Sequence, residues 1–303
     1  MEIRRSAIII MLLSTFAFAV ECTIPRGTSS TACASEPEDD AVKKLAFERK
    51  ERYSKWMRTY VERTQVELKD GNPDNDGDRR VAEMVPNPVL RYSDEEHLIP
   101  DATLWVWTSE GRPVAFQKVE GNDHGGGQQW TICFASVSDG LVNVEWPMDR
   151  SFASNNPGVT FRPIPDAEIP SENVRLRTAQ IKMLKEQFSA GFGFKADGKG
   201  GAAGWGEARI LPKPLFEYSE PNAKMPRGAV FGVSSTGTNP AALLLIEARP
   251  GEVGKLQWHY GLARMTVVSV RASLKNVEIW SEPADNDPVS GRWTYFFLPR
   301  EFR

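Results

Sequence analysis

The sequence has 303 residues, of which 41% are hydrophobic and 25% charged, and its formal net charge is −3 at pH 7. This composition is typical of a globular protein with ample material for a core. The mild acidity gives no basic footprint for nucleic acid or for an anionic membrane, so we expect neither as a partner.

Residues 1–19 have the pattern of a signal peptide. Arg4 and Arg5 form a short basic region, Ala7–Ala19 is apolar, and Ala17-Phe18-Ala19 offers the small-x-small pattern that signal peptidase reads. The apolar stretch of about 13 residues is too short for a membrane span of ~20. We therefore expect cleavage near Ala19, a periplasmic or extracellular location, and a soluble mature chain without a transmembrane segment.

A polar leader is predicted next. Residues 20–40 are rich in Thr, Ser, Pro and acidic residues, a composition that favours disorder. A disulfide between Cys22 and Cys33 of this leader is permitted outside the cytoplasm, but the sequence does not decide whether it forms. Cys133 lies in an apolar segment and is expected to be a small buried residue.

Two parts of the chain carry the same residues at a constant spacing of 126 positions. The matched residues are Pro86, Pro88, Tyr92, Ser93 and Pro100 with Pro212, Pro214, Tyr218, Ser219 and Pro226. With small slips, Trp130 also matches Trp258. Such an internal match predicts two tandem repeats, residues 41–150 and 171–303, joined by a proline-rich linker over 151–170.

The first repeat is predicted to be a helix followed by four antiparallel strands. Apolar residues at helical spacing among many charges favour a helix from about Asp40 to Leu68. The strands, separated by short turns, are Ala102–Thr108, Val114–Val119, Trp130–Val137 and Leu141–Trp146. Ala102–Thr108 is apolar on both faces, so we expect it to be covered on both sides.

The second repeat follows the same plan. A helix is predicted over Glu172–Ala190, capped by Ser171 and ended by Gly191. The strands are Ala229–Val233, Ala242–Ala248, Trp258–Met265, Val267–Trp280 (bulged or split), and an additional Trp293–Leu298. The predicted fold class is therefore α+β, with two repeats of a helix and a four-stranded antiparallel meander.

An acidic loop before the first strands resembles a calcium loop of the EF-hand type. Loop positions 1, 3, 5, 6, 7 and 12 are Asn72, Asp74, Asp76, Gly77, Asp78 and Glu83. Oxygen ligands at these positions, a glycine at position 6 and a final glutamate suit calcium. Against this, position 1 is Asn, position 8 is Arg79, and Pro86 prevents a long exiting helix. A solvated acidic turn is the alternative interpretation, and otherwise no cofactor is predicted.

Other chemical motifs are weak. Gly193-x4-Gly198-Lys199 lacks the Ser or Thr that would complete a P-loop. The histidines show no ligand spacing, and His124, in a polar loop, is the one we retain as a candidate ligand contact. Tryptophans at matched places in both repeats are expected in the core. Trp205 has no such match and is the aromatic candidate for binding a ligand or partner.

The paired motifs Tyr92-Ser93-Asp94 and Tyr218-Ser219-Glu220 lie between an extended segment and a turn. Tyr, Ser and acidic side chains at such places commonly hydrogen-bond nearby backbone groups. We therefore predict two hydrogen-bonded corners that stabilise the fold, rather than two catalytic groups.

Several motifs agree in order with a known group. They are Tyr92-Ser93 after a proline-x-hydrophobic pattern, Trp105-Val106-Trp107 before Gly111-Arg112-Pro113, Arg177 to Ala190, Ala242 to Arg249, and Trp258 to Met265. Over roughly residues 40–300 the chain resembles exported, functionally uncharacterised proteins typical of planctomycete bacteria. The resemblance implies no activity, substrate or catalytic residue.

Two functional hypotheses remain. The first is an exported, non-enzymatic binding or structural module for an unknown partner or polymer at the cell envelope, and it is the one we prefer. The second is a hydrolase-type enzyme whose site lies at the seam between the repeats, where clefts often form. A groove with Trp205 at its rim favours the first, and a pocket with His124 or His259 beside a carboxylate favours the second.

Overall fold

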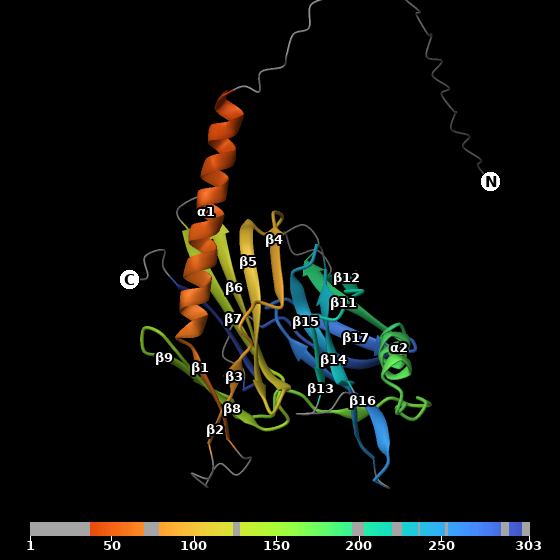
Figure 1. The fold of residues 1–303 in the computed structure, drawn as a ribbon. Helices are drawn as coiled ribbons and strands as arrows, with labels where there is room; N and C mark the ends of the chain where they lie inside the picture. The colour runs from red at the N-terminus through yellow and green to blue at the C-terminus, as the bar shows by residue number, and fades with distance from the viewer. Residues whose placement is uncertain are drawn as a thin grey trace, which may run out of the picture. The chain divides into compact units, whose positions relative to one another are not determined.

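The computed structural model describes residues 37–69, 79–123, 128–195, 203–219, 226–235, 237–251, 254–285 and 291–298 (Figure 1). The chain divides into two units, Met1–Leu45 and Ala46–Arg303. The sheets and the cavity discussed below lie in the second unit. No helix of the described residues is long and apolar enough to cross a membrane.

The predicted α+β class is wrong, because the fold consists mainly of three antiparallel sheets. The described residues contain two helices, α1 (Pro37–Glu62) and α2 (Val174–Lys185). Both are shorter than predicted at their C-terminal ends. Val66 and Leu68 point inward from β1 (Gln65–Lys69), and Gly191 lies in β11 (Phe188–Lys195) instead of ending a helix.

Helix α2 also begins later than expected. Its N-cap is Asn173, whose Oδ1 accepts hydrogen bonds from the backbone N–H groups of Arg175 (3.0 Å) and Leu176 (3.2 Å). Asn is among the best N-cap residues, because its short side chain reaches the unpaired amides of the first turn. Ser171 instead accepts a hydrogen bond from the backbone N–H of Asn173.

The first sheet contains six strands. Its order is β19-β7-β6-β5-β3, and β4 also pairs with β5. The bounds are β3 (Glu83–Met84), β4 (Leu90–Asp94), β5 (Ile99–Ser109), β6 (Arg112–Asp123), β7 (Gln128–Ser136) and β19 (Trp293–Leu298). The predicted strand at the C-terminal end of the sequence therefore completes the sheet of the first half.

The second sheet contains nine strands, in the order β10-β16-β15-β14-β12-β11-β17-β18, with β13 paired to β14. Besides β11 they are β10 (Arg162–Pro163), β12 (Ala203–Ile210), β13 (Phe216–Ser219), β14 (Pro226–Ser234), β15 (Pro240–Pro250), β16 (Leu256–Arg264), β17 (Val270–Leu274) and β18 (Val277–Glu282). The predicted strand 267–280 is split at Lys275 and Asn276, which have positive φ angles of 50° and 65°.

A small third sheet has the order β2-β1-β8-β9. Its other strands are β2 (Arg80–Val81), β8 (Leu141–Trp146) and β9 (Arg150–Ala153). The predicted antiparallel pairing is confirmed. The meander prediction paired β8 with β7, but β8 pairs instead with β1 and β9.

The strands β4 to β7 pair in sequential order, and so do β13 to β16. That the two halves of the chain are a duplication stays a prediction.

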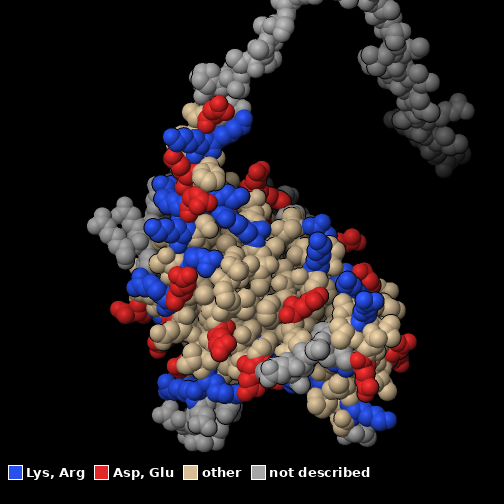
Figure 2. Space-filling view, in the orientation of Figure 1, with Lys and Arg blue, Asp and Glu red and all other residues tan. Residues whose placement is uncertain are grey.

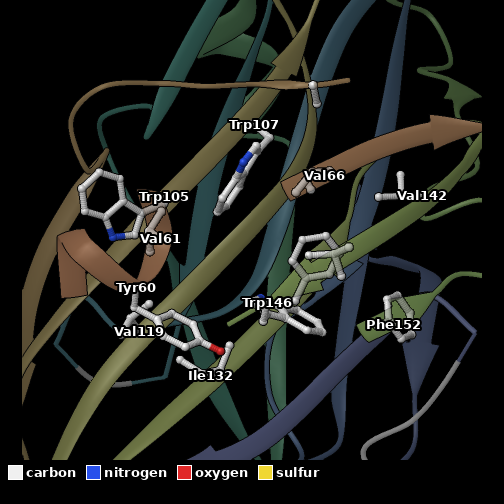
Figure 3. Close-up of a cluster of buried hydrophobic side chains, with 14 of the residues drawn as sticks. Tyr60, Val61, Val66, Trp105, Trp107, Val119, Ile132, Val142, Trp146 and Phe152 are labelled. Carbon is white, nitrogen blue, oxygen red and sulfur yellow. The ribbon is translucent and has the colours of Figure 1, made fainter. Parts of the chain in front are cut away.

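The first and second sheets lie face to face, and each is covered on its outer face. Leu104 and Val106 of β5 belong to the apolar layer between the sheets, together with Leu243 and Leu245 of β15. Trp105 and Trp107, on the opposite face of β5, pack with α1 and the small sheet (Figure 3). Helix α2 contributes to the core on the outer face of the second sheet. The expectation that the strand over Ala102–Thr108, which is part of β5, is covered on both sides is confirmed.

Candidate functional site

A cavity of about 950 Å³ lies where the two large sheets meet, and we call it the seam cavity. The first sheet contributes the end of β4, the turn that leads to β5, and parts of β6 and β19. The second sheet contributes β11, β12, the start of β15 and the segment after β16. The cavity therefore brings together chain segments that are far apart in the sequence.

Buried polar groups line one part of this cavity. Tyr92 donates a hydrogen bond to Oε1 of Glu120 (2.7 Å), and Lys118 Nζ lies 3.4 Å from the same oxygen. Lys118 also donates to Oδ1 of Asn239 (3.1 Å) and to the carbonyl oxygen of Pro240 (3.2 Å). Burial and the neighbouring Glu120 raise the pKa of Tyr92 far above its usual range, so its hydroxyl stays protonated as a donor.

Asp94 and His97 continue this arrangement. Oδ2 of Asp94 accepts a hydrogen bond from Asn239 Nδ2 (2.9 Å) and lies 2.9 Å from His97 Nδ1. Burial alone would raise the pKa of the Asp94 carboxyl, but Asn239 and His97 outweigh it and lower that pKa. We call Tyr92, Asp94, His97, Lys118, Glu120 and Asn239 the Glu120 cluster.

A related arrangement surrounds Glu247 in the second sheet. Tyr218 donates to Oε2 of Glu247 (3.0 Å), and Arg112 Nε also donates to this oxygen (3.0 Å). Arg227 Nε donates to Oε1 of Glu247 (3.0 Å), and Arg249 Nη1 lies 3.8 Å from it. Asp139 bridges Arg112 and Arg249. We call Arg112, Asp139, Tyr218, Arg227, Glu247 and Arg249 the Glu247 cluster.

The two clusters differ in how the opposite sheet completes them. Arg112, just before Pro113 in the first sheet, reaches Glu247 in the second. At the corresponding place in the second sheet, Asn239 lies just before Pro240 and contacts Lys118 of the Glu120 cluster in the first sheet. The shorter amide side chain of Asn fills less space than a guanidinium. The seam cavity reaches the Glu120 cluster, whereas none of the Glu247 cluster lines it.

We expect Asp139→Asn to lower thermal stability at neutral pH and to have little effect near pH 2. Burial alone would raise the Asp139 pKa, but Arg249 and Arg112 lower it to about 2 from its usual 3.8. A lowered folded-state pKa means that the ionised group stabilises the fold above the unfolded-state pKa. This contribution disappears as the pH falls through the folded-state pKa.

The test compares thermal unfolding of Asp139→Asn and the parent protein between pH 7 and pH 2. Asp139 is half-exposed, so we expect a difference of no more than about 1 kcal/mol at pH 7. A stability difference that stays constant over the whole pH range contradicts the assignment.

The structure places one sequence-predicted site residue at the cavity. Trp205 of β12 lines it and is 41% exposed, with Arg271 Cζ 4.3 Å from its ring centroid. His124 lies outside the described residues, as do Asn72, Asp74, Asp76 and Asp78. Of the predicted calcium ligands Glu83 is described, and it pairs in β3 with Thr108 of β5.

No group of three or more His, Cys, Asp or Glu residues in the described ranges is placed to hold a metal ion. The calcium prediction concerns residues mostly outside those ranges and stays a prediction. His259 lies in β16, where its Nδ1 is 3.1 Å from the carbonyl oxygen of Gln257. It does not line the seam cavity.

Sequence reasoning missed the Glu120 cluster as a unit. It predicted a hydrogen-bonded corner at Tyr92, but not the partner Glu120, which lies two strands away. One signal was present in the sequence, because Lys118 and Glu120 flank Val119 in a strand that also contains the apolar run Pro113–Phe116. Charged residues in a strand covered on both sides are seldom buried unless they are paired.

Comparison of the chain with protein-family models, with curated proteins and with solved structures found no match. The resemblance to exported planctomycete proteins therefore stays a prediction. On the face shown in Figure 2, Lys and Arg lie among Asp and Glu, and the middle of that face carries few charged groups.

Proposed function

We propose that this protein binds a small organic ligand in the seam cavity, as an exported binding protein of the cell envelope. The observation that carries the proposal is the cavity itself. Its volume of about 950 Å³ falls within the range of about 300–1,000 Å³ that is usual for small-molecule sites. Proposed export rests on the sequence pattern of residues 1–19.

The walls of the cavity suit a ligand with an apolar body and a polar end. Phe192, Trp205, Met265 and Phe297 contribute apolar surface, and the Glu120 cluster provides polar groups. Ligand sites commonly combine mostly apolar walls with a few fixed polar groups that orient the ligand. The hydrogen bonds within the cluster hold its side chains in place before any ligand arrives.

Binding of the uncharged dye N-phenyl-1-naphthylamine tests this proposal, because its fluorescence increases in apolar surroundings. We expect saturable binding and at least tenfold weaker binding, about 1.4 kcal/mol, to Val268→Trp. Val268 lines the cavity and is 39% exposed, so the larger side chain can enter the cavity without disturbing the core.

The matched control is Val277→Trp. Val277 is 66% exposed on β18 and does not line the cavity, so this variant should bind the dye like the parent protein. Absence of saturable binding to the parent protein, or equal binding to both variants, contradicts the proposal.

One observation favours a hydrolase-type enzyme as the second candidate. Asp94 lies 2.9 Å from His97 Nδ1, an arrangement that orients the imidazole and leaves its Nε2 to act as a base. Ser235, Thr266 and Ser269 line the same cavity, but none of them hydrogen-bonds His97 in the described residues. Hydrolysis of p-nitrophenyl acetate that is lost in His97→Ala would support this candidate over simple binding.

A further inference from the structure

The carboxylate of Glu120 has a hydrogen-bonding capacity that the protein does not use. Its side chain is 3% exposed, and both Tyr92 and Lys118 contact Oε1. No donor to Oε2 exists among the residues that the structure describes. In Glu247, by contrast, both carboxylate oxygens accept hydrogen bonds. Oε2 of Glu120 is not among the fully buried atoms that lack a partner, and Glu120 lines the seam cavity, so this oxygen can accept a hydrogen bond from a ligand there.

The buried ammonium of Lys118 is already occupied. Its side chain is 4% exposed, it donates hydrogen bonds to Asn239 and to the carbonyl oxygen of Pro240, and its Nζ lies 3.4 Å from Oε1 of Glu120 in an ion pair. Two of the three N–H donors of the ammonium group are thus used inside the protein, and its charge is balanced by Glu120. An anionic ligand would have to compete with Glu120 for this residue.

The charges around the cavity favour a cation as well. Asp94, Glu96 and Glu120 line it against one lysine, Lys118. Leaving His97 aside, the lining carries three negative charges and one positive charge, a balance of −2, and Arg271 adds one positive charge beside Trp205. This surplus of carboxylates attracts positive charge to the cavity.

We propose that the ligand of the seam cavity is an amphipathic organic amine, whose protonated nitrogen donates to Oε2 of Glu120. This inference rests on the proposed binding function and names the ligand class. The apolar body of the amine lies against the aromatic wall that includes Trp205. An ammonium group makes an ion pair as well as a hydrogen bond with the carboxylate, whereas an alcohol makes the hydrogen bond alone.

Three naphthalene compounds of similar shape test the ligand class on the parent protein. They are 1-naphthylmethylamine, 1-naphthalenemethanol and 1-naphthoic acid, which are cationic, neutral and anionic at pH 7.5. Each is titrated against bound N-phenyl-1-naphthylamine. We expect the amine to displace the dye at a concentration about tenfold lower than the alcohol, and the acid to be weakest.

The variant Glu120→Gln removes the charge and keeps the shape. It should bind amine and alcohol within about twofold of each other, because the ion pair between the ammonium group and the carboxylate is gone. Its melting temperature is measured first. If the variant does not fold, the order in which the three compounds displace the dye from the parent protein is by itself the test of the ligand class.

The possible outcomes separate the two proposals. If the dye binds and the acid displaces it as well as the amine does, the amine inference is overturned while the binding function stands. If Glu120→Gln folds and keeps the full preference for the amine, the role of Glu120 is overturned. If the dye does not bind the parent protein at all, the binding function itself fails.

Discussion

Replacing Glu247 by leucine is expected to lower the free energy of unfolding by about 3–5 kcal/mol. Glu247 is fully buried, and it receives hydrogen bonds from Arg112, Arg227 and Tyr218. Leucine has a similar volume, so the packing changes little and the charge is what disappears. Removal of one partner from a buried ion pair leaves the remaining charges uncompensated, and this is the costly situation.

The measurement is urea unfolding of Glu247→Leu and of a matched control, Glu282→Leu. The Glu282 side chain is 31% exposed, and its carboxylate lies 3.9 Å from Nη1 of the half-exposed Arg292. Half-exposed ion pairs contribute little, so the control should lose less than about 1 kcal/mol. Equal losses in the two variants would show that the burial of Glu247 does not matter.

Replacing Trp258 by alanine is expected to destabilise the fold by about 3–5 kcal/mol, through lost burial and the cavity left behind. Trp258 of β16 is completely buried in the core that α2 covers. Its indole Nε1 has no hydrogen-bond partner in the described residues, so its contribution is packing rather than polar bonding.

Trp205→Ala is the matched control for this prediction, because Trp205 is a tryptophan that is 41% exposed. Its loss should change stability by no more than about 1 kcal/mol, as is usual for exposed positions. Thermal and denaturant unfolding of both variants measures the stability that each substitution removes. Similar destabilisation by the two substitutions contradicts the distinction between core and cavity tryptophans.

The strands that could be predicted from the sequence are those whose apolar pattern is local. The strands β5, β6 and β7 appear where the alternation and the short turns place them, as do β14, β15 and β16. The helix predictions ran too long because apolar residues of the following strands continued the pattern. Phe188 to Lys195, for example, alternates glycine and phenylalanine after a helical segment, and it pairs with β12 and β17.

A site at the seam between the two halves was among the hypotheses, but most residues of the cavity could not be predicted, because its polar contacts join residues distant in the chain. Asn239 and Asp94 are 145 positions apart, and Asn239 and Lys118 are 121 apart. Neither periodicity nor turn residues carry information about such pairings. Trp205 was singled out only because it lacked a core role, and nothing in its neighbourhood indicated His97 or Glu120 as companions.

The pairing of β19 with β7 has a consequence for the order in which the protein can be built. The strand that covers the outer edge of β7 is Trp293–Leu298, and more than half of the chain is synthesised between the two. Until it arrives, β7 presents unpaired backbone groups, the kind of edge on which strands of other chains add. The first sheet is thus begun before the second sheet is synthesised and completed only after it, and during that time the open edge of β7 exposes the nascent chain to aggregation.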